Sequence, residues 1–231
     1  MIPLRDDNPP GIKPIVTITL IVICVVVFLW QFSLGPNAGE RAIYALGVIP
    51  AVLLGGQQLP PDLQVVPSSV TVLTSMFMHG GWMHLIGNLL YLWIFGDNVE
   101  DSMGHGRFLV FYLLCGIAAA LAQAVPEPNS QIPMVGASGA ISGVLGAYLL
   151  LHPHARVLVV VPLGFILHTV RLPAGLVLVL WFGLQLFSNL MTQPGQGGVA
   201  FRAHIGGFIA GLLLVGVFKK RNVRLFAPAR Y

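Results

Sequence analysis

The chain has 231 residues, of which 9% are charged and 56% are hydrophobic; its formal net charge is +4 and its mean hydropathy is +0.84. An average soluble domain carries about 25% charged residues, so this chain has too few polar groups to cover a soluble surface. Disorder is excluded because it requires low hydrophobicity and high charge. We therefore expect a multi-pass membrane protein that contacts membrane lipid, and no nucleic-acid partner, because no basic stripe lies beside exposed aromatic residues.

Six segments are apolar and nearly free of charge. We expect each to cross the membrane, because a spanning helix needs about 20 mostly apolar residues. They are residues 14–33, 82–99, 108–125, 137–151, 172–191 and 203–218. The predicted fold is an all-α polytopic membrane protein, a six-helix bundle that forms one domain over residues 1–231. Cys24 and Cys115 lie within these runs and are expected to be small core residues without a disulfide.

Two other segments are apolar but interrupted. Residues 34–70 contain five prolines, so we expect a long outer loop with interfacial or re-entrant helices. Residues 157–168 contain Pro162 and Gly164 and are too short and broken to cross; we expect them to lie at the membrane interface. The N-terminal residues 1–14 have neither the order of a removed signal peptide nor the composition of a transit peptide.

The basic residues divide unevenly between the two sides of this bundle. If both termini are cytoplasmic, ten of the twelve Lys and Arg residues fall inside and only Arg41 and Arg202 fall outside. Cytoplasmic loops of membrane proteins carry such an excess. We therefore expect cytoplasmic termini and an integral protein of a plasma membrane, the inner membrane of a bacterium.

Polar side chains inside spans are costly, which makes them functional candidates. His84 and Asn88 are four residues apart in the second span and share one helix face. Ser138 lies in the segment Gly-Ala-Ser-Gly at the start of the fourth span. Each pattern taken alone is explained as well by helix–helix packing, since small and polar residues are common at such contacts.

The third cluster begins the sixth span. His204 precedes Gly207 and Gly211, a G-x-x-x-G pair that lets helices approach closely. By the expected topology His84, Ser138 and His204 all lie near the outer ends of their spans. Independent packing motifs need not agree in depth, whereas the parts of one site must, so the coincidence favours a single site facing the outer side.

Such a site has the groups needed for acyl transfer. A serine becomes nucleophilic when a base takes its proton, and His204 is the candidate base for Ser138. His84, the Asn88 amide and the Ser138 backbone N–H are candidate donors to the oxyanion that develops during attack. Nothing fixes an outer-loop carboxylate beside His204, so we expect a Ser–His dyad, with close helix packing orienting the base.

Other membrane-embedded proteases fit less well. A zinc enzyme would need a pattern such as H-E-x-x-H, and no Glu lies between His79 and His84. An aspartyl enzyme needs two intramembrane aspartates, and only Asp97 lies near a span. We therefore expect no metal and no cofactor.

Residues 76–211 resemble the rhomboid family of intramembrane serine proteases. The resemblance rests on four segments, which are highly specific together: H-G-G-W-M-H-L-I-G-N, N-V-E-D-S-M-G, G-A-S-G and A-H-I-G-G-F-I-A-G. It implies that Ser138 is the nucleophile, that His204 is the general base, and that His84 and Asn88 line the oxyanion hole.

The resemblance also implies supporting roles for other residues. Gly136 would shape the loop beside the nucleophile, and Gly207 and Gly211 would allow close packing beside its helix. His79 would order the loop before the second span, and Glu100 would brace that span at its cytoplasmic end. One departure is Ser142, which stands where some members place an aromatic side chain that stacks on the base, so any stacking on His204 is missing or comes from elsewhere.

The family cleaves single-pass transmembrane proteins near the membrane surface, where the substrate helix unwinds easily; the fifth span is the expected gate. Two alternatives remain open: a catalytically silent rhomboid-like protein that binds membrane helices, and a transporter that uses the intramembrane polar residues. The sequence leaves the natural substrate, the cleavage site and the oligomeric state open.

Overall fold

The computed structural model describes the chain except residues 164–165, 192–198, 227 and 229–231. The polar, Gly-rich segment 193–198, which the sequence predicts to be a loop, lies outside the described residues. The elements in chain order are β1 (Ile2–Asp6), α1 (Ile15–Ser33), α2 (Gly35–Leu46), α3 (Pro50–Leu53), η1 (Pro61–Leu63), α4 (Ser68–Thr74), η2 (Ser75–Phe77), α5 (Trp82–Met103), α6 (His105–Ala124), α7 (Ser138–Leu151), β2 (Arg156–Leu163), β3 (Ile166–Pro173), α8 (Ala174–Met191) and α9 (Phe201–Phe218).

Four of the described helices are long and apolar enough to span a membrane: α1, α6, α8 and α9. The molecule is therefore a multi-pass membrane protein. Helix α5 is long, with 22 residues, but carries polar side chains such as His84, Asn88 and Asp97. Helix α7 is apolar but has only 14 residues, about 21 Å of helix against a hydrocarbon core of about 30 Å. That these two helices also cross stays a prediction.

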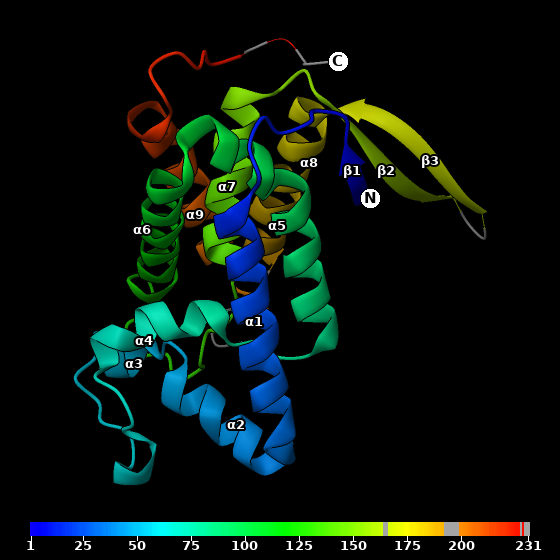
Figure 1. Ribbon diagram of the computed structural model, residues 1–231. Helices are drawn as coiled ribbons and strands as arrows, with labels where there is room; N and C mark the ends of the chain where they lie inside the picture. The colour runs from blue at the N-terminus through cyan, green and yellow to red at the C-terminus, as the bar shows by residue number, and fades with distance from the viewer. Residues whose placement is uncertain (164–165, 192–198, 227, 229–231) are drawn as a thin grey trace.

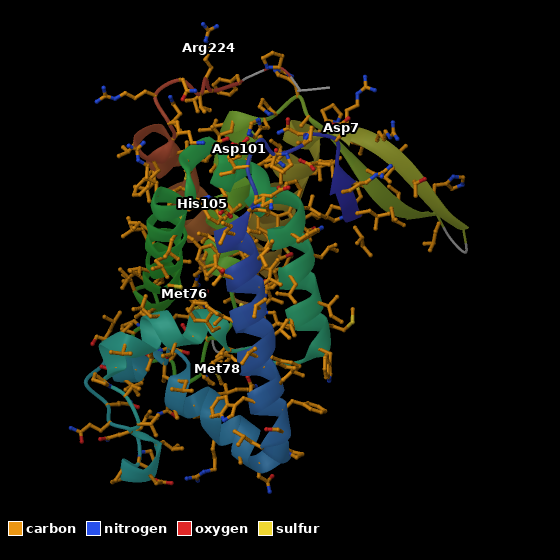
Figure 2. The ribbon with its side chains drawn as sticks, viewed as in Figure 1. Asp7, Met76, Met78, Asp101, His105 and Arg224 are labelled. Carbon is orange, nitrogen blue, oxygen red and sulfur yellow. The ribbon has the colours of Figure 1, made fainter. Side chains whose placement is uncertain are left out.

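The bundle is organised around α7. Almost every residue of α7 is buried, and it packs against α5, α6, α8 and α9. Strand β1 and residues 219–226, which follow α9, lie at one end of the bundle, whereas α2, α3 and α4 lie at the other (Figure 1). The charged side chains of Asp7, Asp101 and Arg224 gather at the first end, and Met78 lies toward the second (Figure 2).

Residues 34–70, expected to be an outer loop with helical pieces, contain α2, α3 and η1. The helical boundaries also differ from the expected spans. Helix α5 continues past residue 99 to Met103, and α6 begins at His105, three residues before the expected start. Helix α8 begins at Ala174 and not at residue 172, because the preceding residues through Pro173 belong to a strand.

The expectation of an all-α fold is wrong in one respect, because the structure contains a three-stranded antiparallel sheet in the order β1-β2-β3. Residues 157–163 and 166–168, which lie in the segment expected at the membrane interface, form most of the β2–β3 hairpin, which extends sideways from the bundle (Figure 1). The run Val157–Val161 is rich in β-branched residues, which favour strands. Val157 and Val159 are buried against the bundle, which fixes the register of the hairpin.

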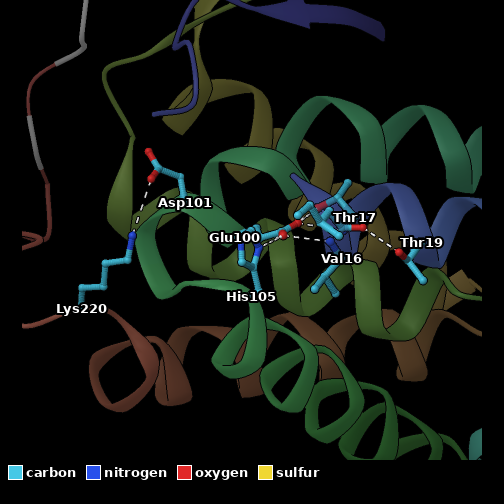
Figure 3. A network of polar contacts seen from close by, with 8 residues as sticks. Val16, Thr17, Thr19, Glu100, Asp101, His105 and Lys220 are labelled. Atoms are coloured by element: carbon cyan, nitrogen blue, oxygen red, sulfur yellow. Dashed lines mark hydrogen bonds and ion pairs between the residues drawn. The ribbon is translucent and has the colours of Figure 1, made fainter. Parts of the chain in front are cut away.

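Glu100 joins three helices at the end of the bundle that holds β1. The carboxylate of Glu100, on α5, accepts hydrogen bonds from the backbone N–H of Val16 over 2.9 Å and of Thr17 over 2.7 Å, and from the Thr17 hydroxyl over 2.7 Å (Figure 3). Oε1 of Glu100, which also accepts from Val16, lies 2.6 Å from Nδ1 of His105 on α6. The residue before α1 provides no side-chain cap for the helix. The buried carboxylate of Glu100 takes this part by accepting from the N–H groups of Val16 and Thr17.

Candidate active site

Ser138 and His204 meet at the end of the bundle opposite the sheet. Ser138 is the first residue of α7, and His204 lies in the first turn of α9. The Ser138 hydroxyl lies 2.8 Å from Nε2 of His204, the geometry of a hydrogen bond from the hydroxyl to the ring nitrogen. Both side chains are half-buried. The arrangement is that of a nucleophile beside its base.

Glycines allow α7 and α9 to come this close. A Cβ atom placed on Gly207 would lie 2.0 Å from the carbonyl oxygen of Gly139, and one on Gly211 would lie 2.0 Å from that of Gly143. Real Cβ atoms do not approach so closely, so no other residue fits at either position without separating the helices. The backbone contact thereby sets the distance between Ser138 and His204.

Gly136 brings the chain before α7 against α5. Its φ of +125° is disfavoured for residues with a side chain. A Cβ atom there would lie 2.6 Å from Nε2 of His84 and 3.7 Å from Nδ2 of Asn88. The backbone just before Ser138 is therefore held within reach of both α5 side chains, which places the four candidate residues in one cluster.

The α5 side chains present hydrogen-bond donors to this cluster. The Gly80 backbone N–H donates to Nδ1 of His84 over 3.3 Å, so the ring carries its proton on Nε2, the nitrogen nearest Gly136. Nδ2 of Asn88 is buried and has no hydrogen-bond partner among the residues that the structure describes. Because Ser138 begins α7, its backbone N–H has no acceptor within the helix. Three donors are thus available to an anionic oxygen.

A cavity of about 960 Å³ contains this cluster. Its walls include Ser138, His204, His84, Asn88 and Gly136 together with apolar residues such as Met76 and Trp181. An apolar cavity with a few converging polar groups is the usual form of a binding site.

His79 lies beside the cluster and organises the loop before α5. It is fully buried, and Gln31 of α1 binds its backbone at both the carbonyl oxygen, over 2.8 Å, and the N–H, over 3.3 Å. Burial, with a smaller effect of His84, lowers the pKa of His79 to about 4. A neutral His79 with a tethered backbone matches the loop-ordering role expected for it, which stays a prediction.

Two α8 residues at the site were missed by the sequence reasoning. Nδ1 of His204 lies 2.8 Å from Oε1 of Gln185, and the rings of Trp181 and His204 lie 6.0 Å apart with an angle of 35° between their planes. Trp181 is the aromatic neighbour that Ser142 does not provide, since the Ser142 hydroxyl donates to the Ser138 carbonyl. Gln185 is a strongly polar residue in a mostly apolar span, as Asn88 is, and this signal could have identified it.

The loop acids have partners of their own. Glu127 pairs with Arg202 over 2.5 Å, and Asp62 pairs with Arg41. In the part of the chain that the structure describes, no carboxylate forms a hydrogen bond with His204, whose partners are Ser138 and Gln185.

A protein-family comparison matches residues 67–221 to the rhomboid domain. Three curated relatives are similar to the chain. Rhomboid protein 1, mitochondrial, of Saccharomyces cerevisiae is 30% identical over 216 residues, 83% of this chain and 59% of the relative. Rhomboid protease GluP of Bacillus subtilis is 37% identical over 154 residues, 65% of this chain and 28% of the relative. Rhomboid-like protein 11, chloroplastic, of Arabidopsis thaliana is 30% identical over 162 residues, 67% of this chain and 54% of the relative.

The matched region of 155 residues contains all four candidate residues of the cluster. The chain matches between 28% and 59% of the length of these relatives.

Proposed function

Because the chain belongs to the rhomboid family, we propose that it is an intramembrane serine endopeptidase that works with a Ser138–His204 dyad. The observation that carries the proposal is the 2.8 Å contact between the Ser138 hydroxyl and Nε2 of His204 inside a cavity lined by unused donors. The name of the Bacillus subtilis relative, Rhomboid protease GluP, supports the same activity.

The proposed reaction follows from this geometry. Nε2 of His204 takes the hydroxyl proton while Oγ of Ser138 attacks the carbonyl carbon of the scissile peptide bond. The negative charge on the carbonyl oxygen is stabilised by the Asn88 amide, Nε2–H of His84 and the Ser138 backbone N–H. His204 then gives its proton to the leaving amine. Water, activated by the same base, hydrolyses the acyl-enzyme and regenerates the Ser138 hydroxyl.

We propose single-pass transmembrane proteins as substrates, cut near the outer membrane face. A peptide bond inside a helix is shielded, and unwinding in hydrocarbon leaves backbone groups without partners. The cavity lies at one end of the bundle, where an unwound segment meets water. Helix α8 is the candidate gate, because its buried residues are confined to Ala174, Val177 and Leu178 near its start.

The proposed orientation places both termini in the cytoplasm and the cavity on the outer side, in the inner membrane of a bacterium. The excess of basic residues at the end that holds β1 supports this orientation. The relatives include proteins named as mitochondrial and chloroplastic. Cysteine labelling from either side of sealed spheroplasts tests the orientation, and fractionation of the source cells tests the compartment.

The activity is tested with purified protein in proteoliposomes that contain a model single-pass substrate. The wild type should cut the substrate and react with a fluorophosphonate probe at Ser138, whereas Ser138→Ala should do neither. Full cleavage by Ser138→Ala would contradict the proposal. A folded wild type that binds the substrate helix but is neither labelled nor active would identify a catalytically silent binder.

A further inference from the structure

We infer that Gln185 of α8 is a positioning residue for the base: it holds His204 in the tautomer that accepts the Ser138 proton. This inference rests on the proposed function and extends it from two residues to three. The contact that carries it joins Nδ1 of His204 and Oε1 of Gln185 over 2.8 Å.

The tautomer follows from the two contacts of the ring. A neutral imidazole has one N–H donor and one acceptor nitrogen. Oε1 of Gln185 is an acceptor only, so Nδ1 carries the proton and donates it to Gln185. Nε2 is then unprotonated and faces the Ser138 hydroxyl at 2.8 Å. The opposite tautomer would leave Oε1 facing a lone pair and would point an N–H at the hydroxyl that must be deprotonated.

Gln185 therefore occupies the place that a carboxylate has in a Ser-His-Asp triad, where the third residue orients the ring and selects its tautomer. An amide performs these tasks without a charge. This matters at membrane depth, where a carboxylate paired with a neutral histidine is costly. The amide gives less stabilisation to the imidazolium that forms during attack, since it adds no negative charge.

Helix α8 presents a second contact to the same ring. Trp181 lies one turn before Gln185, on the same face of the helix, and its ring packs at 6.0 Å from that of His204. Many side chains on other faces of α8 are exposed, such as Leu184 at 58% and Leu190 at 75%. The face that carries Trp181 and Gln185 is thus the one turned toward the base, and an outward movement of α8 would remove both supports.

The test compares four proteins in the proteoliposome assay: wild type, Gln185→Leu, Gln185→Glu and Leu184→Ala. Gln185→Leu keeps the side-chain size and removes the acceptor. Its kcat should fall about tenfold, the effect of losing one neutral hydrogen bond, with little change in KM. Leu184→Ala truncates a neighbouring exposed side chain and should keep the wild-type kcat. The probe-labelling rate should follow kcat in each protein.

Gln185→Glu supplies a readout that a merely structural bond would not move. A carboxylate beside the ring favours its charged form, so the acid limb of the pH–rate profile should shift to higher pH, as should the pH at which Ser138 loses its reactivity toward the probe. Among the described residues, the groups facing His204 are Ser138 on α7, Gln185 and Trp181 on α8, Phe201 on its own helix and His84 across the cavity. Gln185→Glu changes the charge at residue 185 alone and leaves the other four groups as they are.

The tautomer is measured directly by ¹⁵N correlation spectra of histidine-labelled protein, with the His204 signals assigned from His204→Ala. The wild type should show the proton on Nδ1, and Gln185→Leu should show a mixture of tautomers. An unchanged tautomer and an unchanged kcat in Gln185→Leu would overturn the inference while leaving the proposed function standing. Failure of the proposed function is recognised separately, because then the wild type itself neither cuts nor is labelled.

Discussion

At the scale of single residues, the site contains a group that folding alone does not explain. Within the described part of the chain, Nδ2 of Asn88 is buried without a hydrogen-bond partner. Leaving a buried donor unpaired costs about 1–3 kcal/mol, and most buried polar groups in proteins are satisfied. The proposed role of Asn88 as a donor to the oxyanion of a bound substrate would account for this cost.

Replacing Asn88 should therefore separate activity from stability. In Asn88→Leu, which keeps the side-chain volume, kcat should fall about 10²-fold, the usual effect of losing one oxyanion donor. The thermal midpoint of unfolding in detergent should stay the same or rise, because the variant removes an unsatisfied buried donor. Cleavage assays measure the expected fall in kcat, and thermal scans on the same preparation measure the unfolding midpoint. A kcat near that of the wild type would remove Asn88 from the proposed oxyanion hole.

Gly136 is constrained by its backbone and by its neighbour. An added methyl group would meet the His84 ring at 2.6 Å, and the φ of +125° would be strained. Gly136→Ala should displace His84 and lower kcat by at least tenfold, with a destabilisation of about 1–3 kcal/mol. Denaturation and kinetic measurements test this, and a fully active, equally stable variant would contradict the geometry.

At the scale of elements, the approach of α7 and α9 decides whether a site forms. These helices meet backbone to backbone where Gly207 and Gly211 face the carbonyl oxygens of Gly139 and Gly143. The same pattern in the sequence was compatible with simple packing. The close approach matters for chemistry because Ser138 and His204 lie at the same end of the two helices, where it brings them into contact.

Widening this contact should abolish activity. Gly211→Ala places a methyl group 2.0 Å from the Gly143 carbonyl oxygen, so the helices must separate and the hydrogen bond between Ser138 and His204 is lost. Overpacking of this kind costs about 1–3 kcal/mol or more. The matched control is Gly216→Ala on the same helix, where no atom lies within 4 Å of the added methyl group. It should keep its activity and be stabilised by up to about 1 kcal/mol of helix propensity. Equal behaviour of the two variants would show that the close approach is not required.

At the scale of the whole molecule, β1 ties the sheet to the helical bundle. The Asp6 carboxylate accepts hydrogen bonds from the Tyr148 hydroxyl of α7 and, over 3.0 Å, from the Asn98 amide of α5. Burial raises the pKa of Asp6 to about 7 from its ordinary 3.8, with smaller contributions from Asp97 and Asp7 in the same direction and an opposing one from the Tyr148 bond. The folded protein thus holds a proton on Asp6 that the unfolded chain releases.

Stability should consequently fall as pH rises across this window. The contribution of Asp6 is fully present below pH 3.8, where both states are protonated, and is lost as pH rises to about 7. Asp6→Asn mimics the protonated side chain and should remove this component. From pH 4 to pH 7, the unfolding midpoint of Asp6→Asn should therefore rise relative to that of the wild type. A pH-independent difference would contradict the assignment.

Much of the candidate site could be predicted from the sequence, because it depends on residues that are conspicuous in apolar surroundings. Ser138, His204, His84 and Asn88 were all recognised as polar groups within spans, and the structure brings them to one cavity. Gln185 meets the same criterion and was passed over, because it belongs to no motif recognised in the sequence, although Ser188 and Asn189 lie in the same span. The sheet was missed because short runs such as 157–168 suit a strand or an interfacial helix equally.

The sequence by itself determined that the chain is a membrane protein and which residue types are available for catalysis, because hydropathy and residue spacing are local properties. Tertiary structure alone decided what those residues touch. The 66 positions that separate Ser138 from His204 are closed by helix packing, and the contact of Gln185 depends on which face of α8 turns inward. Contacts between distant segments depend on the shapes of both partners, and neither segment encodes the other's position.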